Sequence, residues 1–475
     1  MLINRLPLVQ QYLLKLNQAL LSIRKNCDIS ILSTCQMASL NIILVGLIVT
    51  KSLNWAAFGR CSLQKEKPSA LRWIFYYAKI PWDSLFRAST QVLIQHYGIT
   101  HGTISIDDTD KKRVKKTSKI PNAHKIKDKA TGGYFNGQEL IFMVLVTDLV
   151  TIPIGFRFYV PDPALSAWRK EDKRLKKKGV IAKDRPNAPK PNDIEYPKKQ
   201  DLGLSMLQEF RNNFPDIDVK GIVADALYGT DDFMEKASNS TKKGDKKTQT
   251  VSQIRSNQIV SSKHSTTSVQ QYFSRQTGVE HTLKIRGDKP QKVTMLAARL
   301  YVKAHGRRRY VVALKYENET DYRYLVASDL SWRFIDIVQI YTLRWLVEVF
   351  IQDWKTHCGW NKLSKQQGVK GSERGLIVSL LCDHLLLLHP EQSIRLKNKQ
   401  PGLPVGCIIE RLNVESLLIT VEAVVDSEDP NEALKALSEA LKESLPTRNS
   451  SKHMAGRDLG RQESTESLKY HAKAA

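Results

Sequence analysis

The spacing of apolar residues divides the chain into a helical first part and a mixed second part. Up to about residue 98, apolar residues recur at helical spacing, as in Val9–Ile23, Met37–Thr50 and Trp82–His96. Beyond Gly98, short apolar and β-branched runs predict strands. We expect strands at Thr103–Ile106, Gln138–Val146, Thr151–Val160 and Val219–Ala224, and a helix at Leu202–Phe214. This order predicts an α/β domain with a mixed sheet, preceded by an all-α region.

A second group of strands is expected after Asp225. It follows a short helix at Asp231–Ala237 and a polar loop, and includes Thr282–Arg286, Tyr310–Tyr316 and Tyr322–Ala327. Helix resumes near Trp332. From Pro446 onward the chain is polar, and its composition predicts a disordered tail.

A run of basic residues lies between the third expected strand and the helix that follows it. From Arg169 to Lys199 there are 12 basic residues against 5 acidic ones. The sequence predicts an exposed loop here. Contact with a DNA backbone and a merely solvated charge run are equally compatible with the pattern.

Composition adds a strong positive charge to this picture. The 475 residues are 41% hydrophobic, which is ordinary for a globular protein, but 73 Lys and Arg face 48 Asp and Glu, giving a net charge of +25. A surplus of this size attracts polyanions, of which nucleic acid is the commonest. The six cysteines form no Cys-x-x-Cys pair, and the run Met37–Thr50 is shorter than the roughly 20 residues of a membrane span. A protein of the reducing cytoplasm is expected.

Four side chains with phosphate- or metal-binding chemistry are regularly spaced between Ile340 and Trp360. On one continuous helix, Tyr341, Arg344, Glu348 and Lys355 would share an arc of about 60°. A carboxylate placed between cationic groups could meet a metal and phosphates together. The alternative is an amphipathic helix with internal salt bridges, such as Arg344 with Glu348.

Two aspartates extend this group of candidates. Asp107 and Asp225 each follow an expected strand, which places a carboxylate at the rim of the sheet. Together with Glu348 they make a set of hard oxygen ligands suited to Mg²⁺ or Mn²⁺, and two such ions can drive phosphodiester chemistry. A lone aspartate after a strand is more often a turn or cap residue, so the prediction rests on the three together.

The pattern Tyr341-x2-Arg344-x3-Glu348-x6-Lys355 resembles the YREK signature of DDE transposases from bacterial insertion sequences. Asp107-Asp108-Thr109 is similar to the motif around the first aspartate of that family, and Ala224–Gly229 to the motif around the second. The segment Ile254–Asn257 is similar to the strand that follows. The resemblance covers roughly residues 100 to 390.

The resemblance implies a ribonuclease H-like core interrupted by a mainly β insertion, which the 123 residues between Asp225 and Glu348 could hold. It implies that Asp107, Asp225 and Glu348 bind the metal ions and carry catalysis, and that Tyr341, Arg344 and Lys355 bind DNA phosphates. Asp108, Arg255 and Asn257 are possible accessory residues. The expected divisions are a helical N-terminal domain (1–98), the first part of the core (99–237), the insertion (238–330), the returning core helices (331–392), and a C-terminal helical region with its tail (393–475).

The function implied is cut-and-paste transposition in a bacterial cytoplasm. The enzyme would bind the terminal inverted repeats of its element in double-stranded DNA as a homodimer, cleave there with Mg²⁺ or Mn²⁺, and join the 3′-hydroxyl to target DNA; related enzymes often form a DNA hairpin. Two alternatives stay open: an inactive DNA-binding repressor, and a metal nuclease without strand transfer. The N-terminal helices could bind DNA or hold the dimer together.

Overall fold

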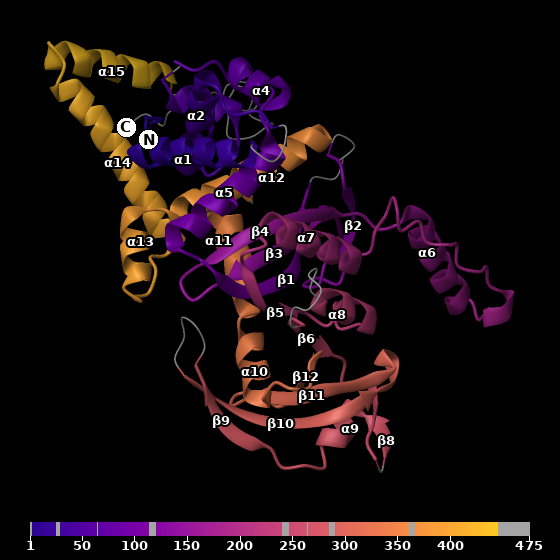
Figure 1. The fold of residues 1–475 in the computed structure, drawn as a ribbon. Helices are drawn as coiled ribbons and strands as arrows, with labels where there is room; N and C mark the ends of the chain where they lie inside the picture. The colour runs from indigo at the N-terminus through magenta and orange to yellow at the C-terminus, as the bar shows by residue number, and fades with distance from the viewer. Residues whose placement is uncertain are drawn as a thin grey trace, which may run out of the picture.

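In the computed structural model, the described residues are 2–24, 29–63, 65–113, 120–239, 247–263, 265–284, 290–360 and 366–444. The chain begins with a bundle of five helices (Figure 1). They are α1 (Pro7–Arg24), α2 (Thr34–Thr50), α3 (Trp55–Cys61), α4 (Pro68–Tyr77) and α5 (Trp82–Tyr97). None of the helices in these ranges could cross a membrane alone; α2 and α3 meet the length and composition only as a pair, and they are bent by 91°.

The core sheet has the strand order β4-β3-β1-β5-β6, followed by the strands of the insertion. β1 is antiparallel to β3 and parallel to β5, and β5 is parallel to β6, so the sheet is mixed. This is the order of a ribonuclease H-like core, and the predicted α/β fold is confirmed. The core elements are β1 (His101–Lys112), β2 (Ala123–Lys127), β3 (Tyr134–Val146), β4 (Thr151–Tyr159), α6 (Pro163–Lys177), η1 (Ala182–Asp184), α7 (Lys199–Asn213), β5 (Asp218–Ala224), α8 (Asp231–Ser238) and β6 (Gln249–Ile254).

The insertion is an antiparallel extension of the same sheet. Its last strand, β12, pairs with β6, and the order continues outward through β11, β10 and β7 to β8. Figure 1 shows these strands gathered at one end of the molecule, away from the N-terminal helices. The elements are β7 (Ile259–Ser261), β8 (Thr266–Ser268), α9 (Val269–Phe273), β9 (Val279–Leu283), β10 (Gln291–Val302), η2 (Lys303–His305), β11 (Arg307–Tyr316) and β12 (Arg323–Ala327).

Helices complete the chain and return it to the core. They are α10 (Phe334–Thr342), α11 (Trp345–His357), α12 (Gly368–Leu387), α13 (Pro390–Lys397), α14 (Val405–Val425) and α15 (Pro430–Ser444). The prediction of one continuous helix through Ile340–Trp360 is wrong, because the helix breaks at Leu343 and Arg344. Hydrogen bonds there span three residues, as from Leu346 N to Leu343 O at 3.1 Å. The break lets α10 pack on the insertion and α11 on the core.

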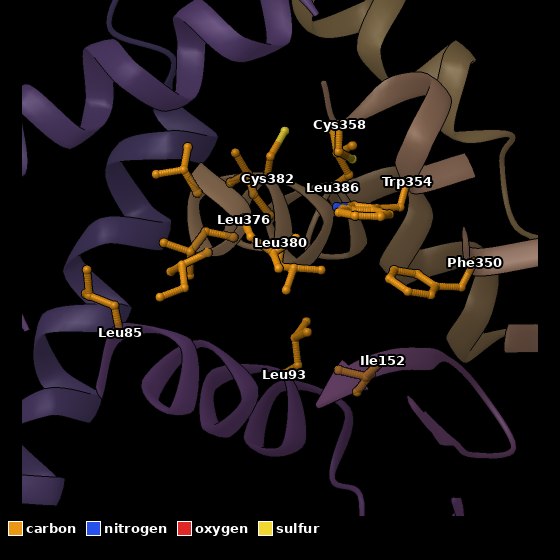
Figure 2. Close-up of a cluster of buried hydrophobic side chains, with 14 of the residues drawn as sticks. Leu85, Leu93, Ile152, Phe350, Trp354, Cys358, Leu376, Leu380, Cys382 and Leu386 are labelled. Carbon is orange, nitrogen blue, oxygen red and sulfur yellow. The ribbon is translucent and has the colours of Figure 1, made fainter. Parts of the chain in front are cut away.

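The largest hydrophobic core joins both ends of the chain to the sheet. Leu85 and Leu93 of α5 face Leu376 and Leu380 of α12, beside Ile152 of β4 (Figure 2). The aromatic rings of α11 close the same core from the other side. The N-terminal helices are therefore part of the scaffold that supports the sheet, whatever else they bind.

Other local predictions need correction. The first strand does not end at Ile106; β1 continues to Lys112 because β3 pairs with it along this whole stretch. The basic run is not a plain loop, since α6 occupies its first part. β2 and β10 were not expected. Arg286, the last residue of one expected strand, and the tail from Pro446 lie outside the described residues.

Candidate active site

Asp107 and Asp225 lie side by side where two parallel strands separate. The last paired residues of β1 and β5 are Ile106 and Ala224, and each aspartate is the next residue along the chain. β5 ends there, whereas β1 continues beside β3 alone. The edge opened in this way leaves the two carboxylates partly accessible in an otherwise buried sheet.

Asp107 and Asp108 point to opposite faces of the sheet, because successive side chains alternate along a strand. On one face, Asp107 meets Arg344 of the α10–α11 junction, with 2.5 Å between Oδ2 and Nη1. On the other face, Asp108 forms an ion pair with Lys199, the first residue of α7. Only Asp107 therefore shares a face with the helix that carries Glu348.

Arg344 connects two of the three predicted carboxylates. Its second terminal nitrogen, Nη2, lies 2.5 Å from Oε1 of Glu348, so one guanidinium bridges Asp107 and Glu348. The arginine and Asp107 are largely buried, with side chains 19% and 12% exposed, while Glu348 is 42% exposed. The ion pair from Arg344 to Glu348, expected from spacing alone, is present, but the pair to Asp107 is the more buried one.

The carboxylates on the strands are held in surroundings that disfavour negative charge. Burial raises the pKa of Asp107 to about 6, against the opposing effect of the Arg344 charge, and the negative charge of Asp225 adds to the rise. Burial also raises the pKa of Asp225, helped by the charge of Asp108 and opposed by a hydrogen bond from Leu227 N to Asp225 Oδ1 at 2.9 Å. A cation placed between these two groups would relieve both effects.

Aromatic packing fixes the helix that carries Glu348. The ring of Phe142 on β3 contacts Phe350 and Trp354 on α11, with ring centroids 5.5 and 4.9 Å apart. Trp354 is fully buried and also stacks on Trp360. Because Phe142 pairs directly with Asp107 across β1 and β3, the same strand position locates both the aspartate and the helix.

The other two predicted phosphate-binding residues lie at different depths. Tyr341, at the end of α10, is 6% exposed within the hydrophobic cluster of the insertion, and burial raises its pKa to about 12. Lys355, in the last turn of α11, donates to the carbonyl of Asp110 at 2.8 Å. Lys355 therefore lies along β1 beyond Asp107, whereas Tyr341 needs a change of surroundings before it can reach a phosphate.

The remaining candidates lie around this centre rather than in it. Arg255 and Asn257 are exposed in the turn after β6, and no described contact joins them to the three carboxylates. Of the basic residues after Asp107, Arg113 is held by Gln138 at 2.9 Å and by the ring of Trp360.

Lys199 and Glu139 were missed by the sequence reasoning. Lys199 pairs with Glu139 as well as with Asp108, and its ammonium lies over the ring of Tyr159. A charged residue at the start of an apolar strand was a usable signal for Glu139. Lys199 had none, because it is one of many lysines in a basic run.

The residues present fit a divalent cation in chemistry, but they are not all assembled. Asp107 and Asp225 are adjacent hard oxygen donors whose mutual repulsion a cation would offset. Over the ranges that the structure describes, however, no three Asp, Glu, His or Cys side chains converge as a metal site. Arg344 keeps Glu348 from joining Asp107, because its guanidinium lies between the two carboxylates.

Comparison with known proteins identifies a sequence family for this chain. A sequence-family model described as DDE superfamily endonuclease matches residues 69–313, just over half of the chain, a segment that includes Asp107 and Asp225 and ends before Glu348. Among solved structures, a piggyBac transposase synaptic complex with hairpin DNA is similar with 12% identity and a TM-score of 0.40, covering 94% of this chain and 79% of that chain. No curated protein matches.

Proposed function

This chain belongs to the DDE superfamily endonucleases, and on that premise we propose that it is a transposase, which cuts DNA at the ends of its own element and joins them to target DNA. The observation that carries the proposal is that Asp107 and Asp225 lie next to each other where two parallel strands separate, while Arg344 links Asp107 to Glu348 on a helix. The positive charge of the chain supports a DNA substrate.

Asp107 and Asp225 would hold the divalent metal, with Glu348 joining them once Arg344 releases it. When bound, Mg²⁺ or Mn²⁺ would activate a water or 3′-hydroxyl and stabilise the leaving oxygen. The protein's own contribution is positional. β1 and β5 hold the two aspartates next to each other, and Phe350 and Trp354 hold α11 against the sheet.

Arg344 and Lys355 supply cationic groups on the same side of the sheet as Asp107. Guanidinium and ammonium groups bind phosphate oxygens through charge-assisted hydrogen bonds. They would grip the backbone on either side of the scissile bond, and Tyr341 would join them if the α10–α11 junction opened.

The finer steps belong to the same proposal. The enzyme would recognise terminal inverted repeats, cleave with water as nucleophile, and use the freed 3′-hydroxyl in strand transfer, with or without a DNA hairpin, in the bacterial cytoplasm. A nuclease without strand transfer and a repressor without catalysis are the competing functions.

Pairing of two DNA ends calls for two copies of the chain. Supporting this, one stripe of α14 presents the exposed apolar side chains Val414, Leu417, Leu418, Val421 and Val425 within about 100° of the helix circumference. An exposed apolar stripe of this kind is typical of a protein contact. We propose that the DNA-bound form is a homodimer.

Cleavage and strand transfer on labelled DNA carrying the element's ends would test the proposal. Wild type is compared with Glu348→Gln and with Glu432→Gln, an exposed glutamate of α15 that serves as the matched control. The proposal requires that wild type and the control cut and join, while Glu348→Gln binds DNA without reacting. If all three proteins bind DNA and none reacts with Mg²⁺ or Mn²⁺, the transposase proposal is replaced by the repressor function. If wild type cuts DNA but does not join it, the function is that of a nuclease.

A further inference from the structure

A helical arm projects from the core between β4 and α7. It comprises residues 163–198, with α6 as its main element, and Figure 1 shows it extending to one side, away from both the N-terminal helices and the insertion. No residue of α6 is buried. The helix therefore contributes nothing to the hydrophobic core. Interactions other than core packing must hold it in place.

Polar contacts brace the arm along its length. At the base, Asp162 Oδ1 accepts from Ala164 N at 2.8 Å, and Oδ2 accepts from Asn192 N at 3.2 Å, so one side chain ties the outgoing helix to the returning segment. Further out, Trp168 Nε1 donates to Pro186 O at 2.7 Å. These contacts hold α6 in one orientation without a core.

The two faces of α6 carry different chemistry. Leu165, Trp168, Asp172 and Leu175 fall within about 80° of one another around the helix, and all four are half-buried. Trp168 and Asp172 contact the returning segment. Here Asp172 pairs with Arg185 at 2.5 Å and with Lys176 at 2.9 Å. An acidic charge of the arm is thus neutralised on its inner face.

The opposite face is basic and faces solvent. Its centre lies about 180° from the inner face and carries exposed side chains spanning about 10 Å of helix: Lys170, Lys173, Arg174 and Lys177. Arg174 pairs with Glu171, but the three lysines form no ion pair with any described residue. Lys176 lies beside the inner face and pairs with Asp172, so the three lysines of the outer face are cations that no acidic side chain of the arm neutralises.

The arm joins the core close to the strand that carries Asp107. The residue that follows the arm, Lys199, pairs through its ammonium with Asp108, on the face of the sheet opposite Asp107. The arm and the carboxylates are therefore mechanically connected through one short stretch of chain.

We propose that the basic face of α6 binds the sugar-phosphate backbone of duplex DNA outside the active site, on one flank of the scissile bond. The inference rests on the proposed function and adds the surface that holds the flanking duplex. A rigid row of cations about 10 Å long matches roughly three base-pair steps along a duplex. Such contacts are independent of sequence, because phosphates carry no base information.

The test measures affinity for a 40-bp duplex of mixed sequence as a function of salt, by fluorescence anisotropy. The variant K170Q/K173Q/K177Q is compared with K397Q/K435Q/K442Q, which removes three exposed lysines from α13 and α15. We expect the arm variant to lower the slope of log affinity against log salt by about 2 to 3, since each phosphate that a lysine no longer neutralises reduces the slope by roughly 0.9. The control variant should leave the slope at the wild-type value.

The outcomes separate this inference from the proposed function. Equal slopes for wild type, arm variant and control would overturn the role of the arm, while cleavage of the element's ends could still proceed. Absence of duplex binding by wild type would overturn both. Circular dichroism of each variant checks that the arm variant is folded, and a truncation series of the duplex from either end shows which flank the arm covers.

Discussion

Arg344 occupies the space between Asp107 and Glu348, with a terminal nitrogen 2.5 Å from an oxygen of each. The guanidinium neutralises two carboxylates that the proposed chemistry needs for metal binding. It is also the group best suited to bind a DNA phosphate in a bidentate manner. Metal and DNA are therefore linked through one side chain, because a phosphate that draws Arg344 away also frees the carboxylates.

Arg344→Gln should strengthen Mn²⁺ binding in the absence of DNA. The variant removes a cation that competes with the metal; hydrogen bonds to charged groups contribute about 1.5–3 kcal/mol each, so the gain should be roughly tenfold or more. Isothermal titration calorimetry of the free protein measures it, with Lys355→Gln as the control. If Arg344→Gln binds Mn²⁺ more weakly than wild type, the arginine supports the metal site instead of competing for it.

Asp107→Asn and Asp108→Asn should have different effects. Asp107 faces α11, and its loss should reduce single-turnover cleavage by roughly 10²–10³-fold, the range found when a group that stabilises transition-state charge is removed. Asp108 faces Lys199, which keeps Glu139 as a partner, so the expected cost is about 1 kcal/mol of stability with cleavage retained. The reverse ranking in a cleavage assay would assign the metal to Asp108.

Gly229→Ala should displace the loop that follows Asp225. An added Cβ would lie 2.4 Å from Gln253 O and 3.1 Å from Ser252 Oγ, and that hydroxyl donates to the carbonyl of Asp225 at 2.5 Å. Overpacking of this kind costs about 1–3 kcal/mol. Denaturant unfolding and cleavage should both be impaired.

Gly203→Ala in α7 is the control for this substitution, since its nearest contact would be an ordinary 3.4 Å to Tyr228. A helical glycine replaced by alanine at such a position should be neutral or mildly stabilising. Equal stability of the two alanine variants would show that the loop after Asp225 adapts freely.

His384 should make the protein less stable in mild acid. Its Nε2 donates to Pro153 O at 2.9 Å, so Nδ1 accepts from Ser89 at 2.6 Å, and Ser89 in turn accepts from Tyr12 at 2.6 Å. Burial lowers the pKa of His384 to about 4. The unfolded chain takes up this proton near pH 6.5, so stability present above that pH is lost as the pH falls to 4, by about 3 kcal/mol.

His384→Gln cannot be protonated and isolates this effect. Urea unfolding at pH 7 and pH 4.5 should show a smaller drop for the variant than for wild type. Asp383 has the opposite sign, because burial raises its pKa to about 7 and stability is lost as the pH rises towards that value. It is present in both proteins, so the comparison cancels it. Parallel pH profiles would exclude His384 as the source.

Leu418→Glu should separate the two copies in the DNA complex. The substitution puts a charge in the centre of the apolar stripe of α14, whereas Ala423→Glu puts the same charge on the opposite face of that helix. Sedimentation with DNA carrying one element end should give two chains per complex for wild type and Ala423→Glu, and one chain for Leu418→Glu. Two chains per complex for wild type and both variants would show that the dimer contact does not lie on this stripe of α14.

The strands that carry the two aspartates could be predicted from sequence because their apolar runs are short and end at polar residues. The alternation of side chains along β1 then gives a structural reason to prefer Asp107 to Asp108, because Asp107 faces the helix that carries Glu348. The side chains of Arg344 and Glu348 also meet as their four-residue spacing indicates.

Three other features of the fold and the site depend on tertiary packing and could not be predicted from sequence. Nothing near Leu343 predicts a helix break, since neither proline nor glycine occurs there; the break exists because Tyr341 belongs to the core of the insertion and Val347 to that of the main sheet. Lys199 reaches Asp108 across 91 residues of chain, which no local pattern encodes. Helix α6 could not be predicted within the basic run, because its inner face packs only against the returning segment of the same arm.

The pairing of β12 with β6 has a consequence for how this chain can vary. Tyr324–Ala327 lies opposite Val251–Ile254, so the insertion leaves the core after β6 and returns to it in the strand that pairs with β6. Strands can be added to or removed from its outer edge without moving the point of return. The number of residues between Asp225 and Glu348 can therefore vary. Two such enzymes could keep the same catalytic geometry while differing greatly in length.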